Sequence, residues 1–467
     1  MRRFRGCFFE VKMHQVELAE AARLEELYAA HVNPQWVRLL DLLRMNVRYT
    51  RCVGAELQTE NGDCILDFLS GYCVHNLGHN HPAVVAALKR ELDECGPAML
   101  QSHVSELAGE LAARLCELAG GGLNKVYFCS SGSEGVETAI KFARAHTQRQ
   151  GLLACSEAFH GLSCGALSLM DNAFWRANFG PLLAGVEIIP FNDVAALARS
   201  LATRQHAAFI VEPIQSEAGV RLPEAGYLAE AQELCRRYGT LFVLDEVQTG
   251  MYRSGHFLAA HQYSVQPDMV VMAKALSGGL VPVGAVLMTE AVNHSVYKSL
   301  QRATVHTSTY SENSLAMRAG LATLQVMREE NLGAQSRRMG EYLRNALAES
   351  LSGYEMVREV RGSGMLNVIE FQAPRKLTLR VPFEAFRAVH GAMFGQILVM
   401  RLFREKKVLT QVCGNNFMAL KVAPPLVISE SQADTFVRSV REVVDLVHSS
   451  GSFWSEALQL AARAVNI

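Results

Sequence analysis

The chain has 467 residues, of which 49% are hydrophobic and 19% are charged, and its formal net charge is −1. This is the composition of a globular protein with material for two or three domains, and it lacks the basic footprint of a nucleic-acid-binding protein. There is no apolar run of about eighteen residues, and the start lacks the apolar core and cleavage site of a secretory signal, so we expect no membrane span and a cytoplasmic location.

The N-terminal part is expected to be helical first and β-rich afterwards. Residues 16–45 have a helical pattern, whereas residues 55–69, "AELQTENGDCILDFL", alternate in polarity on both sides of "ENGD". Asn-Gly-Asp is turn chemistry, so this second stretch predicts a β-hairpin.

The middle of the chain alternates between short β-rich runs and helical patterns. The β-rich runs are "KVYFCS" (125–130), "AAFIVEPI" (207–214), "TLFVLDEV" (240–247), "DMVVMAKAL" (268–276) and "VGAVLMT" (283–289). Helical patterns at 133–146 and 223–239 lie between some of them. This alternation predicts a mostly parallel sheet with helices on both faces, and such sheets bind ligands at the carboxyl ends of their strands.

The C-terminal part is expected to be a smaller α+β unit. It contains the β-rich runs 357–371 and 418–428 and a final helical pattern, which Ser429 and Gln432 open with the spacing of a capping box. We therefore predict an α/β fold with a large domain at residues 79–340. The small domain would be built from both chain ends, residues 1–78 and 341–467.

Eleven cysteines are scattered along the chain without a CxxC pair. They stand at positions 7, 52, 64, 73, 95, 116, 129, 155, 164, 235 and 413. An odd number without paired spacing is typical of reduced thiols, which agrees with a cytoplasmic protein.

Small polar residues lie between a predicted strand and a predicted helix in "FCSSGSEGVETAIKFAR". Gly132, with the hydroxyls of Ser131 and Ser133, is placed to hold an anion such as a phosphate at the helix N-terminus. The alternative is a plain strand-to-helix turn whose serines cap the helix, and this stretch alone does not decide between them.

Asp245 and Lys274 each stand at the end of a predicted strand. On its own such a pair is better explained as a buried structural ion pair. Together with a phosphate site, however, a carboxylate and a lysine are what pyridoxal 5'-phosphate requires: an anion cradle, a partner for the pyridine nitrogen and an amine for a Schiff base.

The stretch "LDEVQTGMYRSGHFLAAHQYSVQPDMVVMAKALSGG" resembles the signature of the class III (ornithine, putrescine and ω-amino acid) aminotransferases, which are fold-type I pyridoxal-phosphate enzymes. The resemblance covers most of the chain, through "HVNPQW", "LDFLSGYCVHNLGHNHP", "AFHGLSCGALS", "VEPIQSEAGV" and "APPLVI". It implies a homodimer with shared active sites, a small-molecule amine donor and an oxo acceptor.

The resemblance also assigns roles to individual residues. Lys274 would be the Schiff-base lysine and the acid–base, Asp245 the partner of the pyridine nitrogen, and Gln248 a neighbour of the ring hydroxyl. The other cofactor contacts that the resemblance implies are Gly132 and Ser133 on the phosphate, Phe159 stacked on the ring with His160 beside it, Glu212 as support, and Thr309 donated by the other subunit.

Four positions bear on the substrate. Where ornithine-type enzymes have an arginine, this chain has Leu162 in "FHGLS", and before "APPL" it has Lys421. Lysine offers a point charge where arginine binds a carboxylate bidentately, so these changes weaken the expectation of dicarboxylate recognition. Glu217 is expected to pair with Lys421, and Tyr72 matches a substrate-contacting tyrosine of the family.

Some polar residues are expected to be structural. His75, His79 and His81 have a spacing that a metal site uses, but their stretch matches a family turn in which Pro82 opens a helix, so we expect no metal site. We expect Tyr252 and Arg253 at the surface or in an interface.

The consecutive acids Asp245 and Glu246 point to opposite faces of a strand, so they are not expected to act as a glycosidase pair. An apparent insertion at 374–396 carries Phe, Met and Val residues. It is expected to pack as a peripheral helix rather than to form a substrate entrance.

These observations predict a pyridoxal-phosphate-dependent aminotransferase whose donor is a diamine or an aliphatic amine. The alternative within the family is an ornithine or ω-amino-acid aminotransferase in which Lys421 receives the carboxylate. Alternatives from other classes are an aminomutase, a racemase or a decarboxylase on the same cofactor, and a non-catalytic homologue.

Overall fold

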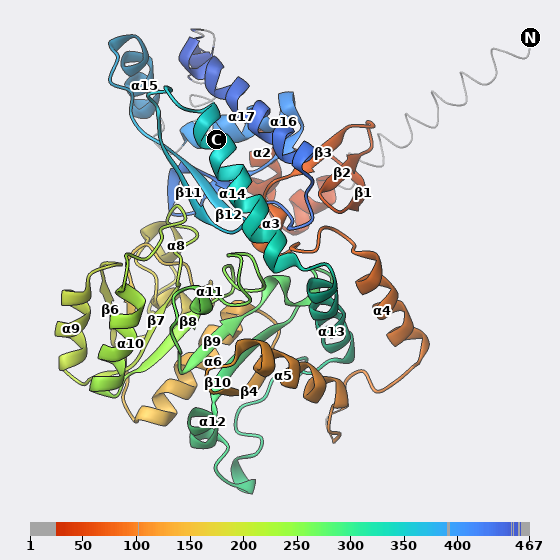
Figure 1. Cartoon of the computed structure of the whole chain (residues 1–467), viewed down its shortest axis with the longest axis vertical. Helices are drawn as coiled ribbons and strands as arrows, with labels where there is room; N and C mark the ends of the chain where they lie inside the picture. Colours follow the sequence, from red (N-terminus) through yellow and green to blue (C-terminus); the bar gives the residue numbers. More distant parts are fainter. Residues whose placement is uncertain are drawn as a thin grey trace, which may run out of the picture.

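A seven-stranded sheet forms the centre of the protein, as the computed structural model shows (Figure 1). The structure describes residues 25–100, 102–389, 393–449, 451, 453–455 and 458. In sheet order the central strands are β4 (Leu123–Cys129), β10 (Gly284–Thr289), β9 (Met269–Met272), β8 (Leu241–Asp245), β7 (His206–Val211), β5 (Gly151–Cys155) and β6 (Val186–Ile189).

The predicted, mostly parallel sheet is confirmed. The pairs formed by β9, β8, β7, β5 and β6 are parallel, and β10 runs antiparallel to both β4 and β9. All residues of β7 and β8 are buried, as expected of strands covered on both faces. The covering helices are α5 (Glu106–Ala119), α6 (Gly132–Thr147), α9 (Val194–Ala202), α10 (Tyr227–Tyr238), α12 (Glu290–Val296) and α13 (Ser314–Glu329).

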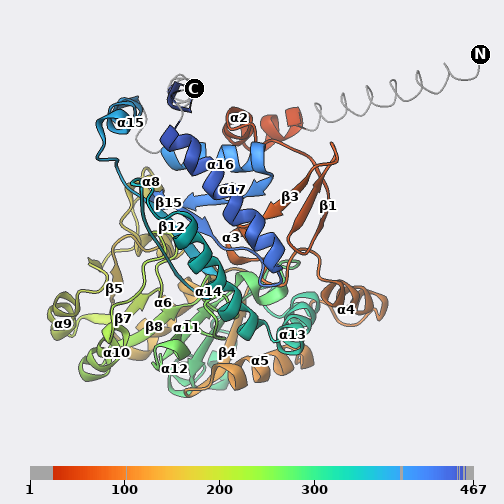
Figure 2. The ribbon, with the colours of Figure 1, turned by 45° about the horizontal axis from the view of Figure 1, so that its top comes forward.

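Two four-stranded sheets lie beyond the carboxyl-end side of the central sheet (Figure 2). The first contains β1 (Tyr49–Val53), β2 (Glu56–Thr59), β3 (Cys64–Asp67) and β13 (Val408–Leu409). The second contains β11 (Val357–Ser363), β12 (Leu366–Phe371), β15 (Asn416–Val422) and β14 (Gln411–Cys413). The predicted hairpin is confirmed, because β2 and β3 pair antiparallel around the "ENGD" turn.

The two ends of the chain meet in the first of these sheets. β13 pairs in parallel with β3, with Val408 opposite Leu66 and Leu409 opposite Asp67. N-terminal and C-terminal segments therefore share one sheet, in agreement with a small unit built from both ends, although the boundaries at 78/79 and 340/341 stay predictions.

The remaining helical segments cap and connect the sheets. They are α2 (Pro34–Leu42), α3 (Ser70–Cys73), α4 (Pro82–Asp93), α7 (Cys164–Ser168), α8 (Ala173–Arg176), α11 (Ala259–Gln262), η1 (Lys274–Ser277), η2 (Leu300–Arg302), α14 (Leu332–Ser350), α15 (Leu377–Val389), α16 (Met393–Lys406) and α17 (Glu430–Ser449). Of the predicted helical stretch 16–45, residues 25–31 and α2 are helical, and residues 16–24 lie outside the described part. Within the described residues no helix is both long and apolar enough to cross a membrane.

The predicted capping box at the start of α17 is confirmed. The backbone N of Ser429 donates to Oε1 of Gln432 at 3.0 Å, and the backbone N of Gln432 donates to Oγ of Ser429 at 3.2 Å. The predicted packing of the insertion is also confirmed for its described residues, because Phe383 of α15 is buried against Phe394 and Trp454. Residues 390–392 of the insertion lie outside the described part.

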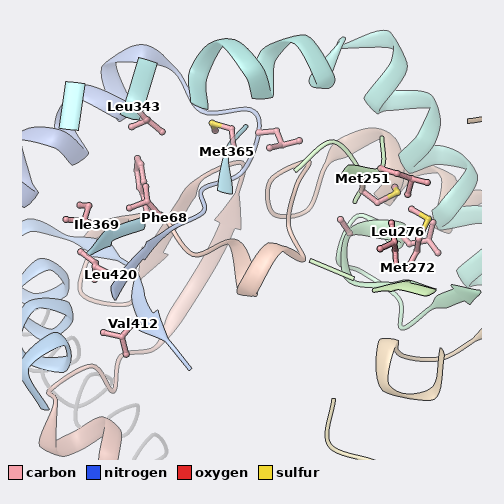
Figure 3. Close-up of a cluster of buried hydrophobic side chains, with 14 of the residues drawn as sticks. Phe68, Met251, Met272, Leu276, Leu343, Met365, Ile369, Val412 and Leu420 are labelled. Atoms are coloured by element: carbon pink, nitrogen blue, oxygen red, sulfur yellow. The ribbon is translucent and has the colours of Figure 1, made fainter. Parts of the chain in front are cut away.

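One apolar cluster runs from the central sheet into the smaller sheets (Figure 3). The cluster joins Met272 and Leu276, at and just after the end of β9, with side chains of β12, β15 and α14. The labelled members are Phe68, Met251, Met272, Leu276, Leu343, Met365, Ile369, Val412 and Leu420. Because interiors are close-packed, this shared core fixes the smaller sheets against the carboxyl ends of the central strands.

Candidate active site

A cavity of about 510 Å³ lies at the carboxyl ends of the central strands. Asp245 ends β8, Lys274 follows β9, and Gly132 follows β4, so three strands of one sheet deliver these residues to one place. The lining includes most of the predicted cofactor contacts, namely Ser131, Gly132, Ser133, Phe159, His160, Glu212, Asp245, Gln248 and Lys274.

Lys274 stands at the start of η1 with a left-handed backbone, φ 46°. No hydrogen bond or ion pair holds its amine within the described part of the chain. Removal from bulk water lowers the pKa of Lys274, and the nearby Cys73 and Glu217 oppose that effect. Behind the lysine, Gly279 has φ 83° and a Cβ there would lie 2.4 Å from the His75 ring, so the glycine turn is required for close packing.

Asp245 is oriented by two contacts. Its Oδ1 accepts from the backbone N of Val247 at 3.1 Å, and its Oδ2 lies 2.8 Å from Nδ1 of the buried His160. Burial lowers the pKa of His160, but the bond to Asp245 and its charge outweigh burial and raise that pKa overall. Nε2 of His160 is buried and has no hydrogen-bond partner among the described residues.

The N-terminus of α6 faces the cavity, with Gly132 as its first residue. A Cβ on Gly132 would lie 2.8 Å and 2.9 Å from the methyl carbons of Val247, so only glycine brings the helix this close to the wall. Oγ of Ser131 caps the helix by accepting from the backbone N of Glu134 at 3.2 Å, and its role as an anion ligand stays a prediction. Oγ of Ser133 lies 2.6 Å from Oγ of Ser163.

Glu212 supports the aromatic wall of the cavity. Its Oε1 accepts from the backbone N of Phe159 at 2.9 Å, and its Oε2 accepts from the backbone N of Ser216 at 3.2 Å. Burial, with the charge of Asp245, raises the pKa of Glu212 to about 7 although His160 opposes this. Glu212 therefore fixes the backbone that carries Phe159.

The expected pairing of Glu217 with Lys421 is present in the structure. Both side chains are buried and their charged groups form an ion pair. Gln248 connects this pair to the cavity, because its Nε2 donates to Oε1 of Glu217 at 3.0 Å. The Tyr72 ring lies over the ammonium, with 5.3 Å between Nζ and the ring centroid. Burial raises the pKa of Glu217, but Lys421 outweighs it and lowers that pKa to about 2.

Five predicted site residues do not line the cavity, namely Tyr72, Leu162, Glu217, Thr309 and Lys421. Three of them, Tyr72, Glu217 and Lys421, form the group described above, which Gln248 connects to the cavity. Leu162 is 55% exposed, and no arginine takes its place in the cavity wall. Thr309 is exposed on the loop between η2 and α13. Its action in the cavity of another subunit stays a prediction.

The three histidines of "HNLGHNHP" have separate partners or neighbours. Nε2 of His79 lies 2.8 Å from Asp67, Nε2 of His81 lies 3.1 Å from Glu330, and the His75 ring stacks on His79. Across the described residues, no group of three or more His, Cys, Asp or Glu side chains is arranged to hold a metal. Pro82 opens α4 as predicted.

The expectation of a surface or interface position was wrong for Arg253, whose side chain is 0% exposed. Its guanidinium donates to groups from distant parts of the chain, including the carbonyl of Met365 at 3.1 Å. No local sequence pattern indicated this burial, because the partners are brought together only by the fold.

No sequence pattern predicted the contact between Trp175 and Asn415, which lies behind Phe159. Nε1 of Trp175 donates to Oδ1 of Asn415 at 2.9 Å, and the Trp175 and Phe159 rings meet edge-on at 5.4 Å. Asn415 in turn donates to the carbonyl of Glu157 at 2.7 Å. These contacts fix the outer side of the aromatic wall.

Comparison with known proteins agrees with this geometry. The family described as aminotransferase class-III matches residues 41–444. The aminotransferase PigE of Serratia sp. (strain ATCC 39006) is 33% identical over an alignment of 449 residues that covers 90% of this chain. The chain spans about half of that relative, 53% of its length.

Solved structures of related enzymes have the same fold. The ornithine aminotransferase of Toxoplasma gondii superposes with a TM-score of 0.77 at 30% identity, covering 86% of this chain and 91% of that one. An (S)-enantioselective omega-transaminase from Thermomicrobium roseum gives 0.78 at 28% identity, covering 91% and 99%. An amine transaminase of an uncultivated Pseudomonas species, solved in a PLP-bound form, gives 0.74 at 26%, covering 85% and 94%. The fold-type I architecture, the site at the strand ends and the match over most of its length show that this chain belongs to the class III aminotransferase family.

Proposed function

We propose that the protein is a pyridoxal-phosphate-dependent aminotransferase that moves an amino group between a primary amine and an oxo acceptor. The observation that carries this proposal is the convergence of Lys274, Asp245 and the N-terminus of α6 on one cavity. The cofactor fits this set, because the close-packed Gly132 leaves backbone N–H groups for a phosphate and the unpartnered Nε2 of His160 leaves a polar atom in the wall.

When bound, the cofactor supplies an aldehyde carbon that receives the amino group and a pyridinium ring that withdraws electrons from the breaking bond. Nζ of Lys274 would hold the cofactor covalently and, once released, would take the proton from the substrate carbon and return it. Its lowered pKa favours the neutral amine that this task needs. Asp245, held by His160, would keep the pyridine nitrogen protonated.

The proposed donor is a diamine such as putrescine or another aliphatic amine, rather than an α,ω-amino acid. Lys421 stands where ornithine-type relatives have an arginine that receives a carboxylate. Glu217 already neutralises the charge of Lys421. Leu162 offers no charge at the other arginine position. An incoming carboxylate would have to displace Glu217, and this costs the energy of a buried ion pair.

The assignment is tested by incubating the protein and Lys274→Ala with pyridoxal phosphate, reducing with borohydride and locating the modified peptide by mass spectrometry. We expect the cofactor on Lys274 in wild type and on no residue of the cavity in the variant. Transamination should fall in the variant by about a hundredfold or more. An unmodified Lys274 would overturn the assignment, and amine isomers, racemised substrate or CO₂ as products would point to the other cofactor-dependent classes.

The donor is tested by kcat/KM for putrescine, a longer alkyl amine and ornithine. The proposal requires the first two to exceed ornithine. Lys421→Arg is the informative variant, because a guanidinium can bind a carboxylate bidentately where lysine cannot. In this variant the ratio of kcat/KM for ornithine to kcat/KM for putrescine should rise. If ornithine is already the better donor of wild type, the ornithine-type alternative is correct.

The proposed assembly is a homodimer with shared active sites. Large apolar side chains are exposed on loops and short helical segments around the central sheet, and such side chains mark an interface where they gather in one patch. They are Leu100 (60%), Val104 (85%), Phe174 (70%), Phe179 (65%), Leu300 (92%) and Tyr310 (64%). Thr309 lies next to Tyr310, so a second subunit that covers these side chains would bring Thr309 towards its partner's cavity.

Subunit complementation tests this arrangement. Lys274→Ala and Thr309→Ala should each have little activity, whereas a mixture refolded or co-expressed together should regain part of it. Each mixed dimer would contain one cavity with both Lys274 and Thr309 intact. Activity that stays at the level of the separate variants, or a monomer in light scattering, would contradict the proposal.

A further inference from the structure

The segment α3 between β3 and α4 has an unusual backbone. Four successive residues are left-handed, with φ of 48° at Ser70, 60° at Gly71, 59° at Tyr72 and 70° at Cys73. Only one of them is glycine, and in the other three the Cβ is forced towards the neighbouring carbonyl. Such strain persists only where surrounding contacts hold it, and it concentrates at functional sites.

Arg253 supplies contacts that hold this segment. Its Nη2 donates to Oγ of Ser70 at 3.1 Å and to Oδ1 of Asn76. Ser70 is the first residue of the left-handed turn, and Asn76 follows its last residue by three positions. Its Nη1 donates to the carbonyls of Met365 and Pro424 at 3.1 Å and 2.5 Å. Oγ of Ser70 donates onward to the carbonyl of Ala423 at 2.7 Å.

The guanidinium of Arg253 is 0% exposed, and all four of these acceptors are uncharged. The charge of Asp67 favours the cation, but no carboxylate among the described residues forms an ion pair with it. Burying a cation without a directly paired carboxylate is costly, so this residue is a poor choice for stability alone. A rigid, planar fork of donors is, however, well suited to fixing several chain segments relative to one another.

The left-handed turn carries residues into the active site. The Tyr72 ring covers the Lys421 ammonium, and Val74 lines the cavity that contains Lys274. Cys73 is 1% exposed and lies close enough to influence Lys274 electrostatically. In Figures 1 and 2, α3 lies between the central sheet and the smaller sheets, where their elements converge.

We propose that Arg253 is a positioning residue of the active site: by binding Ser70 and Asn76 it holds residues 70–73 in the left-handed form and so sets Tyr72 and Val74 against the substrate. The effect on substrate rests on the proposed function. The effect on the backbone does not, because the thiol of Cys73 reports on the turn directly.

The first test measures thiol modification in the cofactor-loaded protein, with the labelled cysteines identified by mass spectrometry. In Arg253→Lys and Arg253→Met, Cys73 should react about tenfold faster or more than in wild type, because the turn opens locally. Cys155 and Cys235, both 0% exposed in the central part of the fold, are internal references and should stay protected. An unchanged Cys73 rate, or an equal rise at all three cysteines, would overturn the proposal.

Ser336→Ala is the matched control. Its Oγ donates to the backbone carbonyl of Arg253 at 3.1 Å and accepts from the backbone N of Met365 at 3.2 Å, but it does not touch the guanidinium. It should leave the reactivity of Cys73 unchanged. If Arg253→Met fails to fold, Ser70→Ala removes one guanidinium contact and keeps the charge, and it should still raise the Cys73 rate.

The second test separates KM from kcat. If the turn positions Tyr72 on the substrate, Arg253→Lys should raise KM for the amine donor about fivefold or more, change kcat less and leave the visible spectrum of the bound cofactor in place. An unchanged KM in a variant with a reactive Cys73 would overturn the link to substrate. A protein that transaminates no amine would instead contradict the proposed function, while the thiol measurement still decides the role of Arg253.

Discussion

Lys421 and Glu217 form an ion pair that is closed to solvent, with exposed fractions of 0% and 6%. Gln248 also donates to Oε1 of Glu217, and the backbone N of Gly414 donates to Oε2 at 2.7 Å. Both carboxylate oxygens therefore have donors before any substrate arrives. Because Gln248 also lines the cavity, a change at this pair is transmitted to the reacting centre.

Replacing one residue of this pair should lower the free energy of unfolding more than replacing both residues. Lys421→Met leaves a buried carboxylate without its cation and should lower the free energy of unfolding by about 3–5 kcal/mol. The double variant with Glu217→Gln should recover most of that loss. Denaturant unfolding of the wild type, the two single variants and the double variant measures the coupling, and strictly additive losses would contradict the pair as described.

The raised pKa of Glu212 should appear in the pH dependence of stability. Since its pKa rises from 4.5 to about 7 on folding, the stability linked to its protonation is fully present below about pH 4.5 and is lost as the pH rises through about 7. In cofactor-free protein, Glu212→Gln should remove this decline, whereas Glu60→Gln at the surface should not. Unfolding curves at several pH values test it, and identical pH profiles for wild type and Glu212→Gln would contradict it.

Gly132→Ala should weaken cofactor binding, because the added Cβ would overlap the methyl groups of Val247. We expect about tenfold weaker binding of pyridoxal phosphate, which corresponds to about 1.4 kcal/mol. Val247→Ala makes room on the opposite wall, so the double variant should regain affinity. If titration gives Gly132→Ala the same affinity for pyridoxal phosphate as wild type, the helix does not need this close approach. The same follows if the double variant regains no affinity.

Asp245→Asn should keep the cofactor but lose most of the catalysis. The amide can still accept a hydrogen bond, yet it cannot stabilise a protonated pyridine nitrogen, so kcat should fall by about a hundredfold or more. His160→Gln should have a smaller effect, because it alters the orientation of Asp245 but leaves the carboxylate in place. Equal losses in the two variants would mean that His160 has a direct role of its own.

Much of the site could be predicted from local patterns. Fully buried parallel strands appear in the sequence as continuous apolar runs, and the residues that directly follow them must meet at one edge of the sheet. Asp245, Lys274 and Gly132 were found in this way, and the resemblance to the family added Phe159, His160 and Glu212. The Ser429 and Gln432 capping box was equally readable, because its partners are three residues apart.

Contacts between distant segments were decided only by the tertiary structure. Ser131 and Ser133 have the same chemistry in the sequence, but the geometry of α6 makes one of them a helix cap and points the other at Ser163. Arg253 looked like a surface residue because its uncharged partners lie elsewhere along the chain. The sequence by itself determined the family, the fold class and the residues at the strand ends, since these follow from periodicity and local motifs; the position of a buried guanidinium depends on which carbonyls the folded chain gathers around it.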